Sequence, residues 1–198
     1  MKGPAGSSIS VALDNQFTAP VDGSVKLGLL IAPVYRFKVT GIPRNPGAEV
    51  YPTVELINRT YPPRGREFEF PIPVEFTAED LELALAGKLV TRVVYIENPR
   101  AALPQAIKEQ RYYEIEPGRD PLVEADRLGR PVAILRIGSR VPDDRNGPDT
   151  QFMFGSPAMF VPGDLLPKIY PQGMPGATVE ESTVRQAAVP ALLPFVQE

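Results

Sequence analysis

The chain has 198 residues, 21 basic and 24 acidic side chains, a net charge of −3 at pH 7, and 24 prolines. Because a proline inside a helix costs about 3 kcal/mol, this proline content excludes a mostly helical protein. His, Cys and Trp are absent, which excludes imidazole bases, thiolate nucleophiles, disulfide bonds and cysteine or histidine metal sites. The balanced charge argues against nucleic acid as a partner.

The sequence predicts no membrane span. A membrane-spanning helix needs about 20 consecutive apolar residues, whereas the longest apolar run, residues 27–34, is interrupted by Gly28 and Pro33. Residues 1–10 lack the apolar core of a secretory signal. The protein is therefore expected either in the cytosol or, after removal of a signal, in an exported location.

The chain from Val21 to Asn98 has the residue pattern of β-strands. Val25–Ile31 and Tyr35–Thr40 are rich in β-branched and aromatic residues, and in the second run apolar residues alternate with Arg and Lys. Such alternation is typical of a half-buried strand. Two further strands are predicted over Val50–Ile57 and Glu67–Val74, and their prolines place them at a sheet edge or a bulge.

A short helix is predicted between these strands and the next. Thr77 can cap its first turn, Asp80 stands three residues later where it can reciprocate, and the apolar stripe ends at Gly87. Leu89–Ile96 follows with the strongest strand signal of the chain. The alternating helix and strand patterns indicate that helices serve as connections between strands.

A second helix is predicted to begin with Asp120 as its cap and Pro121 at its first position. Before it, Arg100–Gln110 is predicted to be a loop with a helical turn, and Tyr112–Ile115 a strand. After it, Pro131–Ile137 is almost continuously apolar. That pattern predicts a central strand buried on both faces.

The fold expected from these elements is a mainly antiparallel β-sandwich of about seven or eight strands, immunoglobulin-like or transthyretin-like, with two short helices in its connections. A Pro-rich extended C-terminal arm completes it, since seven prolines fall between residues 157 and 194 without a sustained period. The predicted division is an N-terminal extended segment (1–20), a β-sandwich domain (21–141) and the arm (142–198).

The arm carries the candidate interaction residues. They are apolar side chains in a segment that is too apolar to prefer water: Phe152, Phe154, Met159 and Phe160. An apolar cluster on a Pro-rich arm can dock on a sheet edge or in a partner's groove. The alternative is that the same cluster packs on its own domain.

No catalytic residue is predicted. Without His, a nucleophile would need Lys or a carboxylate as its base, and Ser139 and Ser156 lack the second glycine of a nucleophile elbow. Paired carboxylates could hydrolyse glycosides. The candidates for such a pair are Glu79, Asp80 and Glu82, and Asp143 with Asp144. The first group lies in the opening turn of a helix and the second in a turn, where acidic residues are common for structural reasons.

No metal and no cofactor is predicted either. The one cluster of oxygen ligands that could suit calcium is Asp143, Asp144, Asn146 and Asp149. Its glycine does not stand at the sixth position of an EF-hand loop. The pattern therefore favours an Asx-type turn.

Five segments together resemble a family of uncharacterised exported or cell-envelope proteins of planctomycete-type bacteria. The resemblance covers roughly residues 20 to 140, and the segments are Gly41–Glu55, Ile72–Asp80, Val93–Pro99, Glu116–Leu122 and Leu135–Gly138. It implies a location in the cell envelope, the periplasm or at the cell surface. It implies a structural or surface role and no particular reaction.

Three functional hypotheses follow from the sequence. The first is a non-enzymatic structural or interaction protein of the bacterial cell envelope, which assembles with itself or with another envelope protein through edge strands and the Pro-rich arm. The second is a β-sandwich module that binds carbohydrate or another cell-wall ligand through exposed tyrosines. The third is a hydrolase that works through carboxylates alone.

Overall fold

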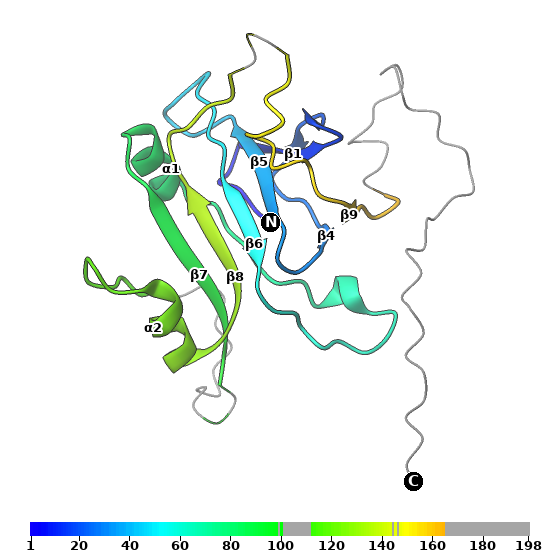
Figure 1. Cartoon of the computed structure of the whole chain (residues 1–198), viewed down its shortest axis with the longest axis vertical. Coiled ribbons are helices and arrows are strands. Elements are labelled where there is room, and N and C mark those ends of the chain that lie inside the picture. Colours follow the sequence, from blue (N-terminus) through cyan, green and yellow to red (C-terminus); the bar gives the residue numbers. More distant parts are fainter. Residues whose placement is uncertain (99, 101–111, 144, 146, 165–198) are drawn as a thin grey trace.

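The computed structural model describes residues 1–98, 100, 112–143, 145 and 147–164 (Figure 1). In this part of the chain the protein is mainly β, with antiparallel sheets and two α-helices. The strands are β1 (Ser8–Leu13), β2 (Gln16–Phe17), β3 (Val21–Asp22), β4 (Gly28–Leu29), β5 (Val34–Thr40), β6 (Thr53–Leu56), β7 (Val90–Glu97), β8 (Gly129–Ile137) and β9 (Met159–Phe160). The helices are α1 (Ala78–Leu85), α2 (Pro121–Leu128) and the single 3-10 turn η1 (Glu67–Glu69).

Over the described residues, the larger sheet has seven strands. Its order is β2-β1-β5-β6-β8-β7, and β3 also pairs with β1. Neighbouring strands are antiparallel throughout, and β7, β8, β6 and β5 lie side by side in Figure 1. A separate two-stranded sheet joins β4 to β9. Strand β7 therefore forms one outer edge of the larger sheet.

The main core lies on one face of this sheet. Leu135 of β8 pairs with Val54 of β6, which in turn pairs with Tyr35 of β5, and all three side chains are buried. Leu81 and Ala84 of α1 pack on the same core. Because residues paired across antiparallel strands share a face, these side chains form one continuous apolar layer.

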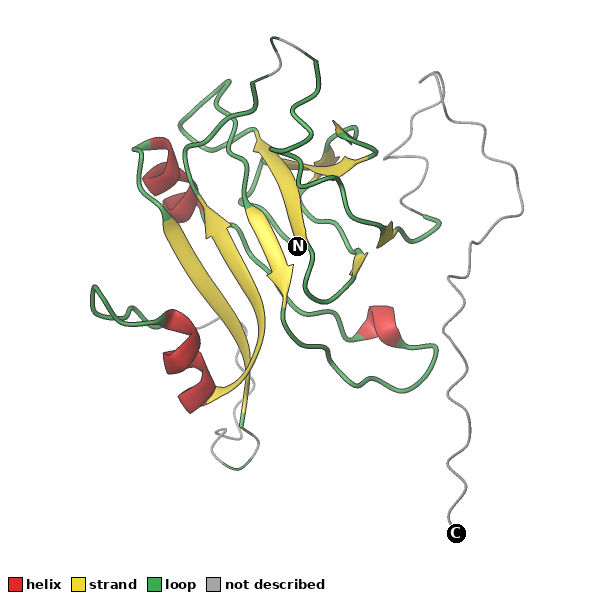
Figure 2. Cartoon of the chain, viewed as in Figure 1, coloured by secondary structure: helices red, strands yellow, loops and turns green. Residues whose placement is uncertain are grey.

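The opposite face is covered at two places. Side chains alternate along β7, so Val93 and Tyr95 point away from the face of Val94, and they line a small cavity together with Ala125 and Leu128 of α2. Figure 2 shows both α-helices near β7 and β8. Further along, the segment that contains Phe152 contacts Arg36 of β5. Helix α2 and this segment together shield the second face.

Both predicted helices and three predicted strands are confirmed. Thr77 caps α1 and accepts a hydrogen bond from the Asp80 backbone, and Asp120 caps α2 in front of Pro121. The run predicted over Tyr35–Thr40 is β5, the run over Leu89–Ile96 is β7 and the run over Pro131–Ile137 is β8. Strand β8 lies inside the sheet, and four of its consecutive residues, Val132 to Leu135, are buried.

Two predicted strands are wrong. Glu67–Val74 begins with η1 and continues without strand pairing, because Pro71 and Pro73 have no N–H to donate to a ladder. Tyr112–Ile115 has no strand pairing either. Val25–Ile31 contains only the short strand β4, and the prediction over Val50–Ile57 shortens to β6.

β1 was not predicted as a strand, although its residues were expected to be extended; it pairs with β5 inside the sheet. The loop expected over Arg100–Gln110 lies outside the described residues except for Arg100. Residues 165–198 of the predicted arm also lie outside them.

Candidate interaction site at the edge of the sheet

The edge of β7 is the starting point of the candidate site. In the described part of the chain, β7 pairs with β8 alone, and its backbone makes no hydrogen bond to any other segment. In an antiparallel edge strand, every second residue directs its N–H and C=O away from the partner strand. An edge of eight residues is thus a template on which another strand can pair.

A groove of about 610 Å³ runs along this edge. One wall is the stretch of β7 from Arg92 to Glu97, and the other is the irregular segment from Glu69 to Glu75. Tyr112 closes one side, and Leu135 and Val132 of β8 contribute to the floor. The groove therefore lies beside the unpaired backbone and can hold side chains of a segment that pairs with it.

The lining of the groove is mostly apolar. Phe70 and Ile96 remain partly exposed, at 46% and 37%, although both are large apolar side chains. Ile72 and Val94 are half-buried and pack against the main core. When a partner covers apolar surface of this kind, the complex is stabilised by about 25 cal/mol for each Å² that is buried.

The charge of Arg92 is neutralised within the wall of the groove. Its Nε and Nη2 donate to Asp80 Oδ2 and Oδ1 at 2.8 and 2.7 Å, and Asp80 is fully buried. These hydrogen bonds, more than the opposing burial, raise the pKa of Arg92 above its ordinary value. A two-point ion pair of this geometry fixes α1 to β7. The charge of Arg92 is thereby paired inside the protein.

Tyr112 is held in place from two directions. Its ring lies 4.6 Å below the Arg92 guanidinium, and its hydroxyl donates to Glu75 Oε2 at 3.1 Å. Burial, followed by the negative charge of Glu75, raises the pKa of Tyr112 to about 12. Glu75 also pairs with Lys2 at 3.0 Å. The phenol is thus neutral at physiological pH and forms an ordered wall.

The four interaction candidates from the arm fall into two places. Phe152 is fully buried against Tyr51, with ring centroids 5.3 Å apart. The Arg36 guanidinium stacks on Phe152 and Phe154, at 4.2 and 4.9 Å from the ring centres, and donates to the carbonyl oxygens of Phe152 and Tyr51. Phe152 is therefore part of the folded domain, and Phe154 remains 45% exposed beside it.

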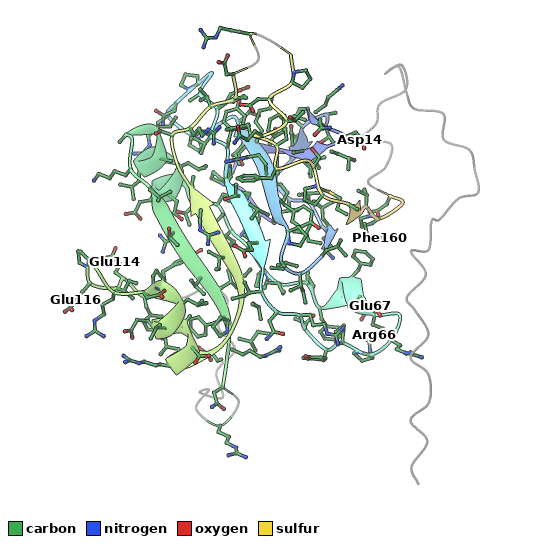
Figure 3. All side chains as sticks on the ribbon, in the orientation of Figure 1. Asp14, Arg66, Glu67, Glu114, Glu116 and Phe160 are labelled. Carbon is green, nitrogen blue, oxygen red and sulfur yellow. The ribbon has the colours of Figure 1, made fainter. Side chains whose placement is uncertain are left out.

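Met159 and Phe160 form β9 and pair with β4. Met159 packs against the main core, whereas Phe160 is 54% exposed and contacts Phe68 beside η1, with ring centroids 5.5 Å apart. Figure 3 shows Phe160 near Glu67 of η1. Neither Met159 nor Phe160 lines the groove at β7.

The carboxylates that a hydrolase would need line neither of the two cavities described above. Asp80 is bound to Arg92, Glu82 pairs with Arg44 at 2.6 Å, and Asp143 is bound by the side chain of Arg145. Within the residues that the structure places, these acids do not meet in a cleft.

Two of the residues considered as calcium ligands, Asp143 and Asp149, accept hydrogen bonds from nearby backbone N–H groups, as in an Asx-type turn. Asp143 accepts a hydrogen bond from the backbone N–H of Arg145, and Asp149 accepts one from Phe152. Asp144 and Asn146 lie outside the described residues. In the described part of the chain no group of three acidic side chains is arranged to hold a metal ion.

Comparison with protein families, with characterised proteins and with solved structures finds no match to this chain. The helices that the structure describes are all too short or too polar to cross a membrane.

Sequence reasoning missed the groove. It predicted β7 correctly but treated Glu67–Val74 as a further strand, which would have left no opening beside the sheet. The signal that could have found it is the pair Pro71 and Pro73. Alternate prolines next to a strong strand indicate a segment that lies beside the sheet without pairing to it.

Proposed function

We propose that this protein is a non-enzymatic structural and interaction protein of the bacterial cell envelope, which assembles with itself or with another envelope protein. The observation that carries the proposal is the edge of β7, which no other described segment pairs with, beside an apolar groove. Strand addition to such an edge combines backbone hydrogen bonds with side-chain pockets, and this is a common mode of protein recognition.

The location in the envelope rests on the resemblance of residues 20–140 to exported planctomycete-type proteins. The immunoglobulin-like or transthyretin-like sandwich remains a prediction within this proposal. The described fold supports it with antiparallel sheets and a buried apolar core.

A charge placed on the groove tests the proposal. Ile96→Lys puts an ammonium group beside the β7 edge, where a paired strand would bury it, and a buried unpaired charge is strongly unfavourable. Val123→Lys is the matched control, because Val123 is a similarly exposed aliphatic residue on α2 that does not line the groove. Light scattering on the full chain then measures the mass.

We expect the unmodified chain and the Val123→Lys variant to be oligomers, and the Ile96→Lys variant to be a monomer with an unchanged denaturation midpoint. A full chain that is monomeric at every concentration contradicts self-assembly. An oligomer that Ile96→Lys leaves intact shows that assembly uses another surface.

Carbohydrate binding is the second candidate, and Tyr61 favours it. This side chain is 72% exposed, and the guanidinium groups of Arg59 and Arg130 lie 5.1 and 5.2 Å from its ring centre. An ordered tyrosine beside two hydrogen-bond donors suits a sugar. Retention on cell-wall polysaccharide that Tyr61→Ala abolishes would support this function, and absence of retention would remove it.

A further inference from the structure

A segment that fills the β7 groove must meet two requirements. It must supply backbone donors and acceptors to β7 at every second residue. It must also present apolar side chains to a lining that includes Phe70, Ile72 and Ile96. A proline is compatible with such a strand only where its missing N–H would point away from β7.

We propose that residues 188–196 of a neighbouring copy of this chain occupy the groove as an added strand along β7. This inference rests on the proposed function and names the partner. The sequence of the segment is Ala-Val-Pro-Ala-Leu-Leu-Pro-Phe-Val, and no charged residue occurs between Gln186 and Gln197. Its apolar character matches the lining of the groove.

The spacing of the two prolines meets the backbone requirement. Pro190 and Pro194 are four residues apart, so both have the same phase in a strand of period two. When both face away from β7, the backbone groups of Val189, Ala191 and Leu193 face towards it. The segment can therefore form all its backbone hydrogen bonds to β7, but its two prolines interrupt those on the opposite side. It ends the sheet and does not extend it further.

The lengths also agree. β7 has eight residues, and the proposed strand has nine. Residues 165–187 connect the described part of the chain to the segment, and at about 3.3 Å for each residue they span up to about 76 Å. This reach exceeds the size of a small domain, so the segment can enter the groove of a second copy.

Assembly of this kind has a defined symmetry. The groove and the segment are different surfaces of the same chain, so each copy offers one of each. Contacts of this type are heterologous and give rings or open chains, whereas pairing of β7 with β7 of a second copy would give a closed dimer. The proposal therefore predicts masses beyond the dimer at high concentration.

Cysteine cross-linking tests the placement, because the chain has no Cys of its own. Full-length Ile96→Cys protein is mixed with full-length Leu192→Cys or Leu193→Cys protein and oxidised. Adjacent residues of a strand point to opposite faces. We therefore expect one of the two segment variants to form a disulfide with Ile96→Cys and the other to form none. Val123→Cys on α2 replaces Ile96→Cys as the control and should give no product.

The proline phase is tested in the full chain by exchanging two neighbours. The double variant Pro194→Phe and Phe195→Pro keeps the composition but turns one proline towards β7, where it removes a ladder hydrogen bond. We expect it to be monomeric by light scattering under conditions in which the unmodified chain is oligomeric. Apolar adhesion without strand pairing would leave its mass unchanged, and that result would overturn the proposal.

Other outcomes also overturn it. A variant that carries both cysteines, one at Ile96 and one in the segment, tests pairing within one chain. If its cross-links form only within single chains at high dilution, the segment lies in the groove of its own chain. An oligomer that forms without any cross-link to the segment would mean that another occupant, such as β7 of a second copy, fills the edge, and the proposed function would still stand. A monomeric full chain would remove both.

Discussion

Arg36 shows how a single cation can hold two parts of the chain together. Its guanidinium donates to the carbonyl oxygens of Tyr51 and Phe152 at 2.7 and 3.1 Å, and its faces lie against Phe152 and Phe154. Burial, with a smaller contribution from the nearby charge of Arg140, lowers the pKa of Arg36 to about 10. The side chain still carries its charge at neutral pH, and it ties β5 to the segment that follows β8.

Phe152→Ala should destabilise the protein by about 3–5 kcal/mol, because it opens a cavity under Arg36 and removes the contact with Tyr51. Phe160→Ala should cost about 1 kcal/mol or less, since that ring is half exposed and, among the described residues, stacks with Phe68 alone. Urea denaturation followed by tyrosine fluorescence measures both. Equal losses would show that the two aromatic residues are not divided between core and surface.

Tyr112 should make the fold sensitive to alkali. A raised pKa means that the folded state holds the phenolic proton more tightly than the unfolded state does. Stability is then independent of this group below the ordinary tyrosine pKa of about 10 and falls as the pH rises towards about 12. Thermal denaturation across this pH range should show a smaller loss in the Tyr112→Phe variant. A loss of the same size would assign it to other groups, such as Tyr35 and Tyr95, whose pKa values are also raised.

At the scale of elements, local signals predicted local structure. The caps Thr77 and Asp120 act within one turn of their helices, so their sequence pattern was sufficient. β8 was also predictable, because a strand inside a sheet needs apolar residues on both sides. β1 was missed although Ser8 and Ser10 alternate with Ile9 and Val11 as in a half-buried strand. Its place inside the sheet depends on pairing with the distant strand β5. The groove could not be predicted because it depends on where an unpaired segment comes to lie.

Truncation should show that only the first part of the arm stabilises the domain. Residues 149–160 contribute Phe152 to the cover of the second face and β9 to the smaller sheet. A chain that stops after Val141 should therefore lose several kcal/mol of stability, at least the amount expected for Phe152→Ala. A chain that stops after Asp164 should retain the denaturation midpoint of the full chain. Similar midpoints for both would show that residues 142–164 do not support the domain.

At the scale of the whole molecule, the two edges of the sheet are unequal. β2 and β3 have two residues each, whereas β7 has eight. Short edge strands protect a sheet against unwanted pairing, and a long edge invites it. The Lys and Pro residues that commonly protect an edge are absent from β7. Among the residues that the structure places, this long edge is the one that lies beside the apolar groove.

Removal of residues 165–198 should change assembly without changing the fold. We expect the chain that stops after Asp164 to be monomeric by light scattering at concentrations where the full chain is oligomeric. The control is a full-length chain with a protease site inserted after residue 164. It should have the oligomeric mass before cleavage and the monomeric mass after it. An oligomer that survives the truncation would locate the interface entirely on residues 1–164.

The contact between the two ends of the domain determines when folding can finish. The backbone N–H of Asn15 donates to Ser156 Oγ across 141 positions of sequence, and Arg36 reaches the Phe152 carbonyl across 116. At about 5–20 residues per second, synthesis of the chain from Asn15 to Ser156 takes about 7 to 28 s. Throughout that time the contacts of Asn15 with Ser156 and of Arg36 with Phe152 cannot form, and the domain is incomplete. A chain with this order of contacts completes its domain only late in its synthesis.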